Sequence, residues 1–213
     1  MKSFLLFLSL IITYTINAQK LAILKYDGGG DWYANPTALP NLINFSNTNT
    51  KTYLDSKIET VTLNDESINN YPILFITGHG NIFFSDDQIK NLRNYLTSGG
   101  FIHISDNYGM DKYIRRELIK VFPKLKLQKI PNNHPIYHQS FSFNKGLPKI
   151  HEHDKKSAQG YGLFFKGRLI LFYDYESDLS DGWEDQEIHN NPKKVRENAL
   201  KMGSNIIEYA FKH

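Results

Sequence analysis

The sequence predicts an α/β fold with a doubly wound, mostly parallel sheet and a β-hairpin late in the chain. Two stretches carry this prediction. Residues 72–109 read as strand, helix and strand, the pattern of a βαβ unit whose two strands are parallel and adjacent. Residues 161–165 and 169–175 are apolar runs joined around Lys166 and Gly167, which is typical of a hairpin.

The central unit has a local signal at each of its boundaries. Residues 73–77 form a short apolar, β-branched run, as expected for a strand that is buried on both faces. Ser85 followed by Gln88 is a capping box that begins a helix, and the glycines at 99–100 tolerate the left-handed conformation that ends one. Residues 101–105 are a second apolar run, so the unit closes with a second strand.

Other elements follow from shorter patterns of the same kind. Apolar runs indicate strands, apolar stripes indicate helices, and Pro123 ends one of those helices. The segment 131–160 has no regular pattern. The remaining expected elements are strands at 20–26, 58–63 (an edge strand) and 125–130, and a helix at 110–122. A further helix is expected after 20–26, with Asn35 or Thr37 as its cap. In the last helix we expect Asn191 as the cap and Pro192 as the first residue, and the helix runs to about Phe211.

Composition excludes several classes of function. The 213 residues include 40% hydrophobic residues, enough for a sizeable core, and we expect one domain over residues 19–213. The net charge is only +3 and no basic run is interleaved with aromatics, so nucleic-acid binding is not expected. The chain contains no cysteine, which excludes disulfides, thiolate metal sites and a cysteine nucleophile.

The first 18 residues have the pattern of a secretory signal peptide. Lys2 supplies a charged start, residues 4–12 are an apolar stretch, and Ala18 offers a small residue at a cleavage point. The apolar stretch falls far short of the roughly 20 residues that span a bilayer, so no stable membrane anchor is expected. We therefore expect an exported protein, periplasmic or secreted, whose mature chain begins near Gln19.

Polar turns follow the predicted parallel strands, and ligands of such sheets bind beyond the carboxyl ends of the strands. Carboxylates, an imidazole and flat rings in these turns suit a polar, carbohydrate-like ligand, and capping of the turns themselves is the competing interpretation. His79 and Asp106 are the candidate catalytic residues. The candidate ligand-binding residues are Asp27, Gly29, Asp31, Trp32, Tyr33, Gly78, Asn107, Tyr108 and Asp111.

Two further stretches carry candidate chemistry. His151 and His153 share one side of an extended segment and are candidate ligands of a divalent metal, with His134, His189 or Asp178 as a third; loop histidines that only form hydrogen bonds are the alternative. The acidic stretch 175–187 suggests calcium or carbohydrate binding, or a solvated loop that caps itself.

Long motifs in the chain resemble a bacterial family, the "domain of unknown function 4159". The resemblance covers residues 21–210 and implies a branch of the flavodoxin-like, class I glutamine-amidotransferase-like folds. Amidotransferases use a cysteine at a strand end where this chain has Asp106, so no glutaminase activity is expected. The motifs are KYDGGGDWYANPTALPNL, ITGHGN, FSDDQIKNLRNYLTSGGFIHISDNYGMD, RREL, VFP, HPIYH, LPKIHEHD, YESDLSDGWED and HNNP.

Three classes of function remain open from the sequence. The first is an exported domain that binds a polar, carbohydrate-like ligand at the carboxyl edge of the sheet. The second is a metal-assisted hydrolase or isomerase that uses His79, Asp106 and the histidines at 151 and 153. The third is a scaffold that binds a protein partner through its aromatic residues. The aromatic residues in question are Trp32, Tyr33 and Trp183.

Overall fold

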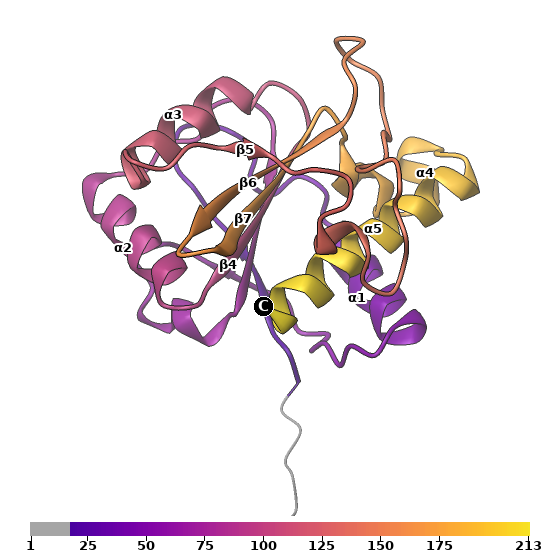
Figure 1. Ribbon diagram of the computed structural model, residues 1–213, viewed down its shortest axis with the longest axis horizontal. Coiled ribbons are helices and arrows are strands. Elements are labelled where there is room, and N and C mark those ends of the chain that lie inside the picture. The colour runs from indigo at the N-terminus through magenta and orange to yellow at the C-terminus, as the bar shows by residue number, and fades with distance from the viewer. Residues whose placement is uncertain (1–17) are drawn as a thin grey trace, which may run out of the picture.

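The computed structural model describes residues 18–213 and shows a mixed α/β architecture (Figure 1). The strands are β1 (Leu21–Leu24), β2 (Glu59–Val61), β3 (Ile73–Gly78), β4 (Phe101–Asp106), β5 (Gln128–Lys129), β6 (Gln159–Phe165) and β7 (Arg168–Tyr175). The α-helices are α1 (Ala38–Asn49), α2 (Asp86–Thr97), α3 (Asp111–Val121), α4 (Gln186–His189) and α5 (Lys193–Lys212). Short 3₁₀ turns lie at η1 (Glu66–Asn70), η2 (Pro135–Tyr137) and η3 (Leu179–Gly182).

The seven strands form one sheet in the order β2-β1-β3-β4-β7-β6-β5. The first five of these are parallel to one another, and β6 and β5 are antiparallel to their neighbours. The sheet is therefore mostly parallel, as the sequence predicted, with its antiparallel strands gathered at one edge.

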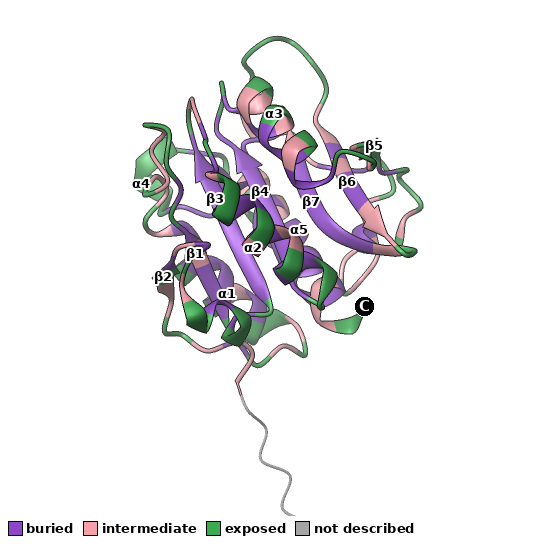
Figure 2. Ribbon diagram, turned by 90° about the vertical axis from the view of Figure 1, so that its left-hand side faces the viewer, coloured by how far each residue is buried: buried purple, intermediate pink, exposed green. Residues whose placement is uncertain are grey.

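Helices cover both faces of the sheet because side chains alternate along the buried strands. On β3, Leu74 and Ile76 belong to the core that α2 and α3 complete. Ile73 and Phe75 point the other way, into the core shared with α1 and α5. Figure 2 shows the buried sheet behind α2 and α3. Both cores thus depend on strands that are apolar on each face.

The predicted βαβ unit is confirmed. Strands β3 and β4 pair in parallel from Ile73 opposite Phe101 to Gly78 opposite Asp106. The capping box is present, since the Ser85 side chain accepts from the Gln88 amide and the Gln88 side chain accepts from the Ser85 amide. Local signals were sufficient here because strand, helix and strand follow directly on one another, and such a connection places its two strands in parallel.

The predicted hairpin is also confirmed as β6 and β7, and the structure adds where each strand lies. Strand β7 pairs in parallel with β4, and residues 169–174 are fully buried, whereas β6 lies one position further out. The hairpin therefore extends the sheet instead of lying over its edge.

Three local predictions are wrong. The strand expected at 125–130 is only Gln128–Lys129, an exposed edge strand on β6, because both of its side chains face solvent and little of it is paired. Pro192 is the N-cap of α5 and not its first residue, since its ψ of 136° is extended. Asn191 does not cap the helix, because its side chain binds His151 instead.

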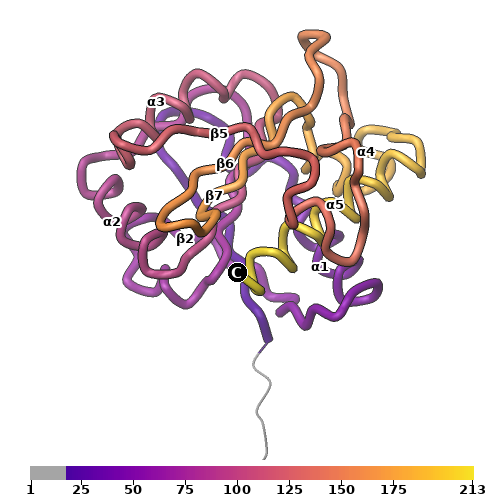
Figure 3. The backbone as a smooth tube through the Cα atoms, viewed as in Figure 1, coloured from indigo at the N-terminus to yellow at the C-terminus, as the bar shows by residue number. Residues whose placement is uncertain are grey.

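The segment 131–158 contains the short turn η2 and an isolated bridge between His138 and Ser142, in agreement with its irregular sequence. In Figure 3 its backbone, coloured salmon to orange, runs along the α5 side and then into a projecting loop.

Of the expected signal peptide, residues 1–17 lie outside the described residues. Within residues 18–213, none of the helices combines the length and apolar character that crossing a bilayer requires.

Candidate functional site

The turns after β1, β3 and β4 meet at the carboxyl edge of the sheet. The Asn81 side chain donates to the carbonyl of Gly28 over 2.8 Å, which joins the first turn to the second. The backbone amide of Asn107 donates to the backbone carbonyl of Gly78 over 3.2 Å, which joins the second turn to the third. The three turns therefore converge, as the sequence predicted.

His79 and Asp31 form a hydrogen-bonded pair on the rim of this edge. The His79 Nδ1 atom lies 2.9 Å from Asp31 Oδ2, and the His79 amide donates to the other oxygen of the same carboxylate. The His79 side chain is 54% exposed, so solvent reaches it freely. Gly78 allows Asp31 to lie this close to the turn, because a Cβ atom on Gly78 would lie only 2.9 Å from Asp31 Oδ1.

Other members of the first turn are spread around this pair. Asp27 accepts a hydrogen bond from Gln88 over 3.2 Å, and Gly29 is exposed with no neighbour within 4 Å of a Cβ built on it. Trp32 packs edge-on against Tyr33, which is 66% exposed. These four predicted ligand-binding residues therefore do not line a single pocket.

Asp106 holds the turn after β4. One of its oxygens accepts from the amides of Tyr108 and Met110, and the other accepts from the Tyr173 hydroxyl over 2.9 Å. Burial raises the pKa of Asp106, and the hydrogen bonds from Met110 and Tyr173 oppose that rise. These contacts fit the capping interpretation of Asp106, because its oxygens are already engaged within the protein.

Asn107 belongs to a buried network of amides and hydroxyls. Its Oδ1 atom accepts from Ser180 over 2.9 Å and from Thr77 over 3.2 Å, and its Nδ2 atom donates to the side-chain oxygen Oδ1 of Asn35. Asn107 is only 3% exposed. Its side chain therefore ties the ends of β3 and β4 to η3 and does not face solvent, where a ligand would approach.

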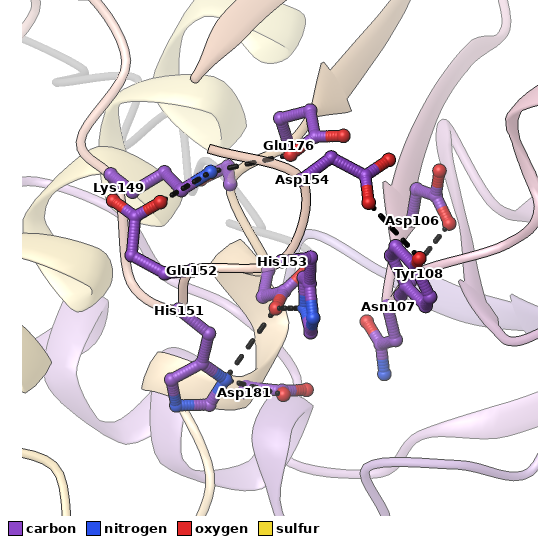
Figure 4. Close-up of polar contacts among 12 residues, drawn as sticks. Asp106, Asn107, Tyr108, Lys149, His151, Glu152, His153, Asp154, Glu176 and Asp181 are labelled. Carbon is purple, nitrogen blue, oxygen red and sulfur yellow. Dashed lines mark hydrogen bonds and ion pairs between the residues drawn. The ribbon is translucent and has the colours of Figure 1, made fainter. Parts of the chain in front are cut away.

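A groove of about 330 Å³ opens beside the β4 turn. Tyr108, Gly109 and Asp111 contribute one side of it. Figure 4 shows the Tyr108 hydroxyl meeting Asp154, whose Oδ1 atom is 3.1 Å away. The complete lining is Asp106, Tyr108, Gly109, Asp111, Lys112, Asp154, Lys156, Tyr175 and Glu176.

Lys156 and Glu176, which the sequence analysis did not select, hold the far side of this groove. The Lys156 ammonium lies 3.1 Å from Asp154 and 3.1 Å from the Tyr175 hydroxyl. Glu176 is buried at a positive φ of 56°, and Lys149 pairs with its carboxylate over 3.3 Å. The acidic character of 175–187 was a usable signal for Glu176, whereas no pattern marked Lys156.

The histidines at 151 and 153 both contact Asp178 but otherwise have different partners. His153 stacks on Tyr108 with ring centroids 4.5 Å apart, and its Nε2 atom contacts Asp178. His151 lies between Asp181, 3.0 Å from its Nδ1 atom, and Asn191, 3.0 Å from its Nε2 atom. Contacts with Asp178 and Asp181 raise the pKa of His151 to about 10.

Of the three suggested third ligands, two lie beside His151 and one does not. His134 packs against Phe164 and Tyr209 and is not part of the group formed by His151, Asp181 and His189. His189 stands near His151, with ring centroids 5.1 Å apart, and Asp178 is 3.5 Å from His151. The structure therefore groups His151 with His189, Asp178 and Asp181, while His153 serves as the link to Tyr108.

The prediction of a solvated acidic loop at 175–187 is wrong for residues 176–184. Asp178, Asp181 and Glu184 are all buried, because η3 packs between the sheet and helices α1 and α5. Trp183 is fully buried as well, and its Nε1 atom donates to the Ala199 carbonyl over 2.8 Å. An aromatic docking patch that includes Trp183 is therefore excluded.

A larger groove of about 650 Å³ lies by the amino end of β1, at the opposite edge of the sheet. Its one acidic side chain, Glu208, is already engaged by the amide and hydroxyl of Ser140, each 2.9 Å away. The rest of its lining is mainly short uncharged side chains and lysines. The carboxyl edge, with its converging charges, is the better candidate for binding.

This arrangement defines an α/β domain with a polar groove at the carboxyl ends of its parallel strands. The family model described as "Domain of unknown function (DUF4159)" matches residues 20–211, and the chain belongs to this family. The family expected from the sequence motifs is therefore confirmed. A comparison with curated proteins finds no match to the chain.

Proposed function

We propose that this protein is an exported domain that binds a polar, carbohydrate-like ligand in the groove beside Tyr108. The observation that carries the proposal is the fixed position of the Tyr108 ring. Tyr108 is 48% exposed, has a φ of 92°, and is held by His153 on its face and Asp154 at its hydroxyl. Backbone in this region is uncommon for a bulky residue and is concentrated at binding and catalytic sites.

The charges of the groove favour a neutral, hydroxyl-rich ligand. Its lining contains four carboxylates and two ammonium groups, a formal balance of −2, which disfavours an anionic ligand. Carboxylates accept from hydroxyl groups and ammonium groups donate to them, while a fixed aromatic face covers apolar C–H surface. This combination is typical of pockets in which a few polar groups orient a ligand.

Glutaminase activity is not part of the proposal. The chain has no cysteine to form a thioester, and Asp106 at the comparable strand end already accepts three hydrogen bonds.

Metal-assisted hydrolysis is the second candidate function. One arrangement supports it, namely the proximity of His151, Asp181 and His189 on the same edge of the sheet.

Titration of the isotope-labelled protein with a panel of neutral oligosaccharides, followed by NMR, tests the proposal. We expect chemical-shift changes at Tyr108, Asp154 and Tyr175. The Tyr108→Ala variant should bind at least about tenfold more weakly, because it loses the ring face. Tyr53→Ala is the matched control, since Tyr53 is also exposed but lies near the opposite edge, beside Gln19.

Two results would contradict the proposal. The first is a panel in which no sugar shifts the groove resonances while the protein remains folded. The second is a sugar that binds Tyr108→Ala as tightly as it binds the unchanged protein.

A further inference from the structure

We infer that His151, Asp181 and His189 form a binding site for a zinc-class divalent cation, a site that is separate from the groove. The three side chains offer one ligand atom each, all within 4.8 Å of one another. Asp181 Oδ2 lies 3.0 Å from His151 Nδ1 and 3.8 Å from His189 Nε2. Zinc bonds of about 2.0–2.2 Å in a tetrahedral site place neighbouring ligand atoms about 3.4 Å apart. Of the two distances from Asp181 Oδ2, one is slightly shorter than this value and the other slightly longer.

Neighbouring amides orient two of the three ligand atoms. The Asn191 Oδ1 atom lies 3.0 Å from His151 Nε2, which places a proton on Nε2 and leaves the Nδ1 lone pair for a cation. The Asn35 side chain donates over 2.7 Å to Asp181 Oδ1, which leaves Asp181 Oδ2 for the same cation. Partners of this kind fix the tautomer and direction of metal ligands, and here they select the two atoms that face each other.

A second observation concerns Asp178, a carboxylate that lies next to His151. Within the described residues, Asp178 Oδ1 is buried and has no hydrogen-bond partner, although Asp178 is only 1% exposed. Buried carboxylate oxygens nearly always have a partner. The other oxygen of this carboxylate lies 3.5 Å from His151 Nδ1, so the group borders the proposed site. A cation, or a water bound to it, would supply a partner for the Asp178 carboxylate.

The chemistry of the ligands selects the class of cation. Two imidazoles and one carboxylate suit zinc and similar transition metals, whereas magnesium and calcium prefer oxygen ligands alone. Three protein ligands leave a fourth position open, which is the pattern of catalytic and not of structural zinc sites. The side chains of His151 and His189 are 26% and 29% exposed, so solvent or a substrate can reach that position.

Metal content measured on the tag-free chain tests the inference without any assay of activity. The chain is stripped with a chelator, dialysed against zinc, and analysed by inductively coupled plasma mass spectrometry and by calorimetry. We expect one zinc per chain, and no calorimetric binding of magnesium or calcium under the same conditions. Cobalt in place of zinc should give the visible absorption bands of a low-symmetry site with nitrogen ligands.

Variants at His189 and Asp181 locate the site. His189→Gln and Asp181→Asn should each weaken zinc binding at least about tenfold, because each removes one of only three protein ligands. The matched control is His79→Gln, which removes another histidine paired with an aspartate, in this case Asp31 at 2.9 Å. His189 lies on the short helix α4 and is exposed, so its variant is expected to fold; circular dichroism checks this.

Zinc retained equally by His189→Gln and by the unchanged chain would overturn the inference. The same holds if the unchanged chain binds less than half an equivalent of zinc. In that case a protonated His151 would itself balance the charge of Asp178 and Asp181. These outcomes are independent of the sugar titration, because the groove and the three proposed ligands share no residue.

Discussion

His153 stacks on Tyr108 with ring centroids 4.5 Å apart and ring planes inclined by 27°. This contact joins the irregular segment 131–158 to the turn that follows β4. The same segment supplies Asp154 and Lys156 to the groove. The stretch with the least regular sequence therefore forms one wall of the candidate site.

Removing this stack should loosen that wall. We expect Tyr108→Ala and His153→Ala to be non-additive, with a coupling of about 0.5–1.5 kcal/mol in the free energy of unfolding, because stacked rings attract each other beyond the area they bury. Urea unfolding of the two single variants and the double variant measures the coupling. Additivity within about 0.3 kcal/mol would show that the contact contributes nothing.

Gly78 should be intolerant of any side chain. It has a φ of 132°, and a Cβ atom would lie 2.4 Å from the Tyr26 hydroxyl and 2.9 Å from Asp31 Oδ1. We expect Gly78→Ala to lower the free energy of unfolding by at least about 2 kcal/mol, from backbone strain and overpacking together.

Gly80→Ala is the matched control for this prediction. Gly80 also has a positive φ, 74°, but a Cβ atom there would meet nothing within 4 Å. Its substitution should therefore cost only the strain, about 1 kcal/mol. Equal losses in the two variants, measured by thermal or urea unfolding, would show that the close approach of Tyr26 to Gly78 is unimportant.

The buried pair of His103 and Asp174 should make stability depend on pH. Their side chains are 2.7 Å apart in the core, and Ser105 also donates to Asp174. Burial lowers the pKa of His103 to about 3 and raises that of Asp174 well above its usual value. The folded pair therefore keeps one proton over a wide range of pH.

The sign of the effect follows from the unfolded chain, where histidine titrates near 6.5 and aspartate near 3.9. Between about pH 4 and 6.5 the unfolded pair also holds one proton, so the contribution of the pair to stability is constant. Above about pH 6.5 the unfolded chain holds fewer protons than the folded one. The contribution should then fall as pH rises, by at most about 1.4 kcal/mol per pH unit.

Urea unfolding at pH 5, 6, 7 and 8 tests this dependence, with the double variant His103→Gln, Asp174→Asn as the reference that cannot titrate. NMR of the His103 imidazole in the unchanged protein gives an independent measure. A stability difference that rises between pH 7 and 8, or an imidazole that titrates near pH 6.5, would refute the prediction.

Export predicts a shortened mature chain. When the full sequence is expressed with a secretion pathway, protein recovered outside the cytoplasm should have the mass of a chain that begins at Gln19. Leu8→Arg should abolish export because it interrupts the apolar stretch, whereas Ser3→Arg should leave export intact because it adds charge where charge is expected. An exported mass that retains residues 1–18 would contradict the prediction.

By itself the sequence determined the family, the mostly parallel α/β sheet, and the edge where polar turns would meet. Each of these rests on signals from residues close together in the chain, such as the capping box of Ser85 and Gln88 or the apolar run at 73–77. Hydrogen bonds within a helix turn and side-chain alternation along a strand are local, so a local pattern is enough to predict them.

Only the tertiary structure decided which polar groups work together. His103 and Asp174 are 71 positions apart and meet because β7 inserts beside β4, an order that no local pattern specifies. Asp181 is buried against Asn35, 146 positions away, because η3 packs between the sheet and two helices. Pairing between residues so distant depends on strand order and packing, and these arise only when the whole chain has closed its two cores.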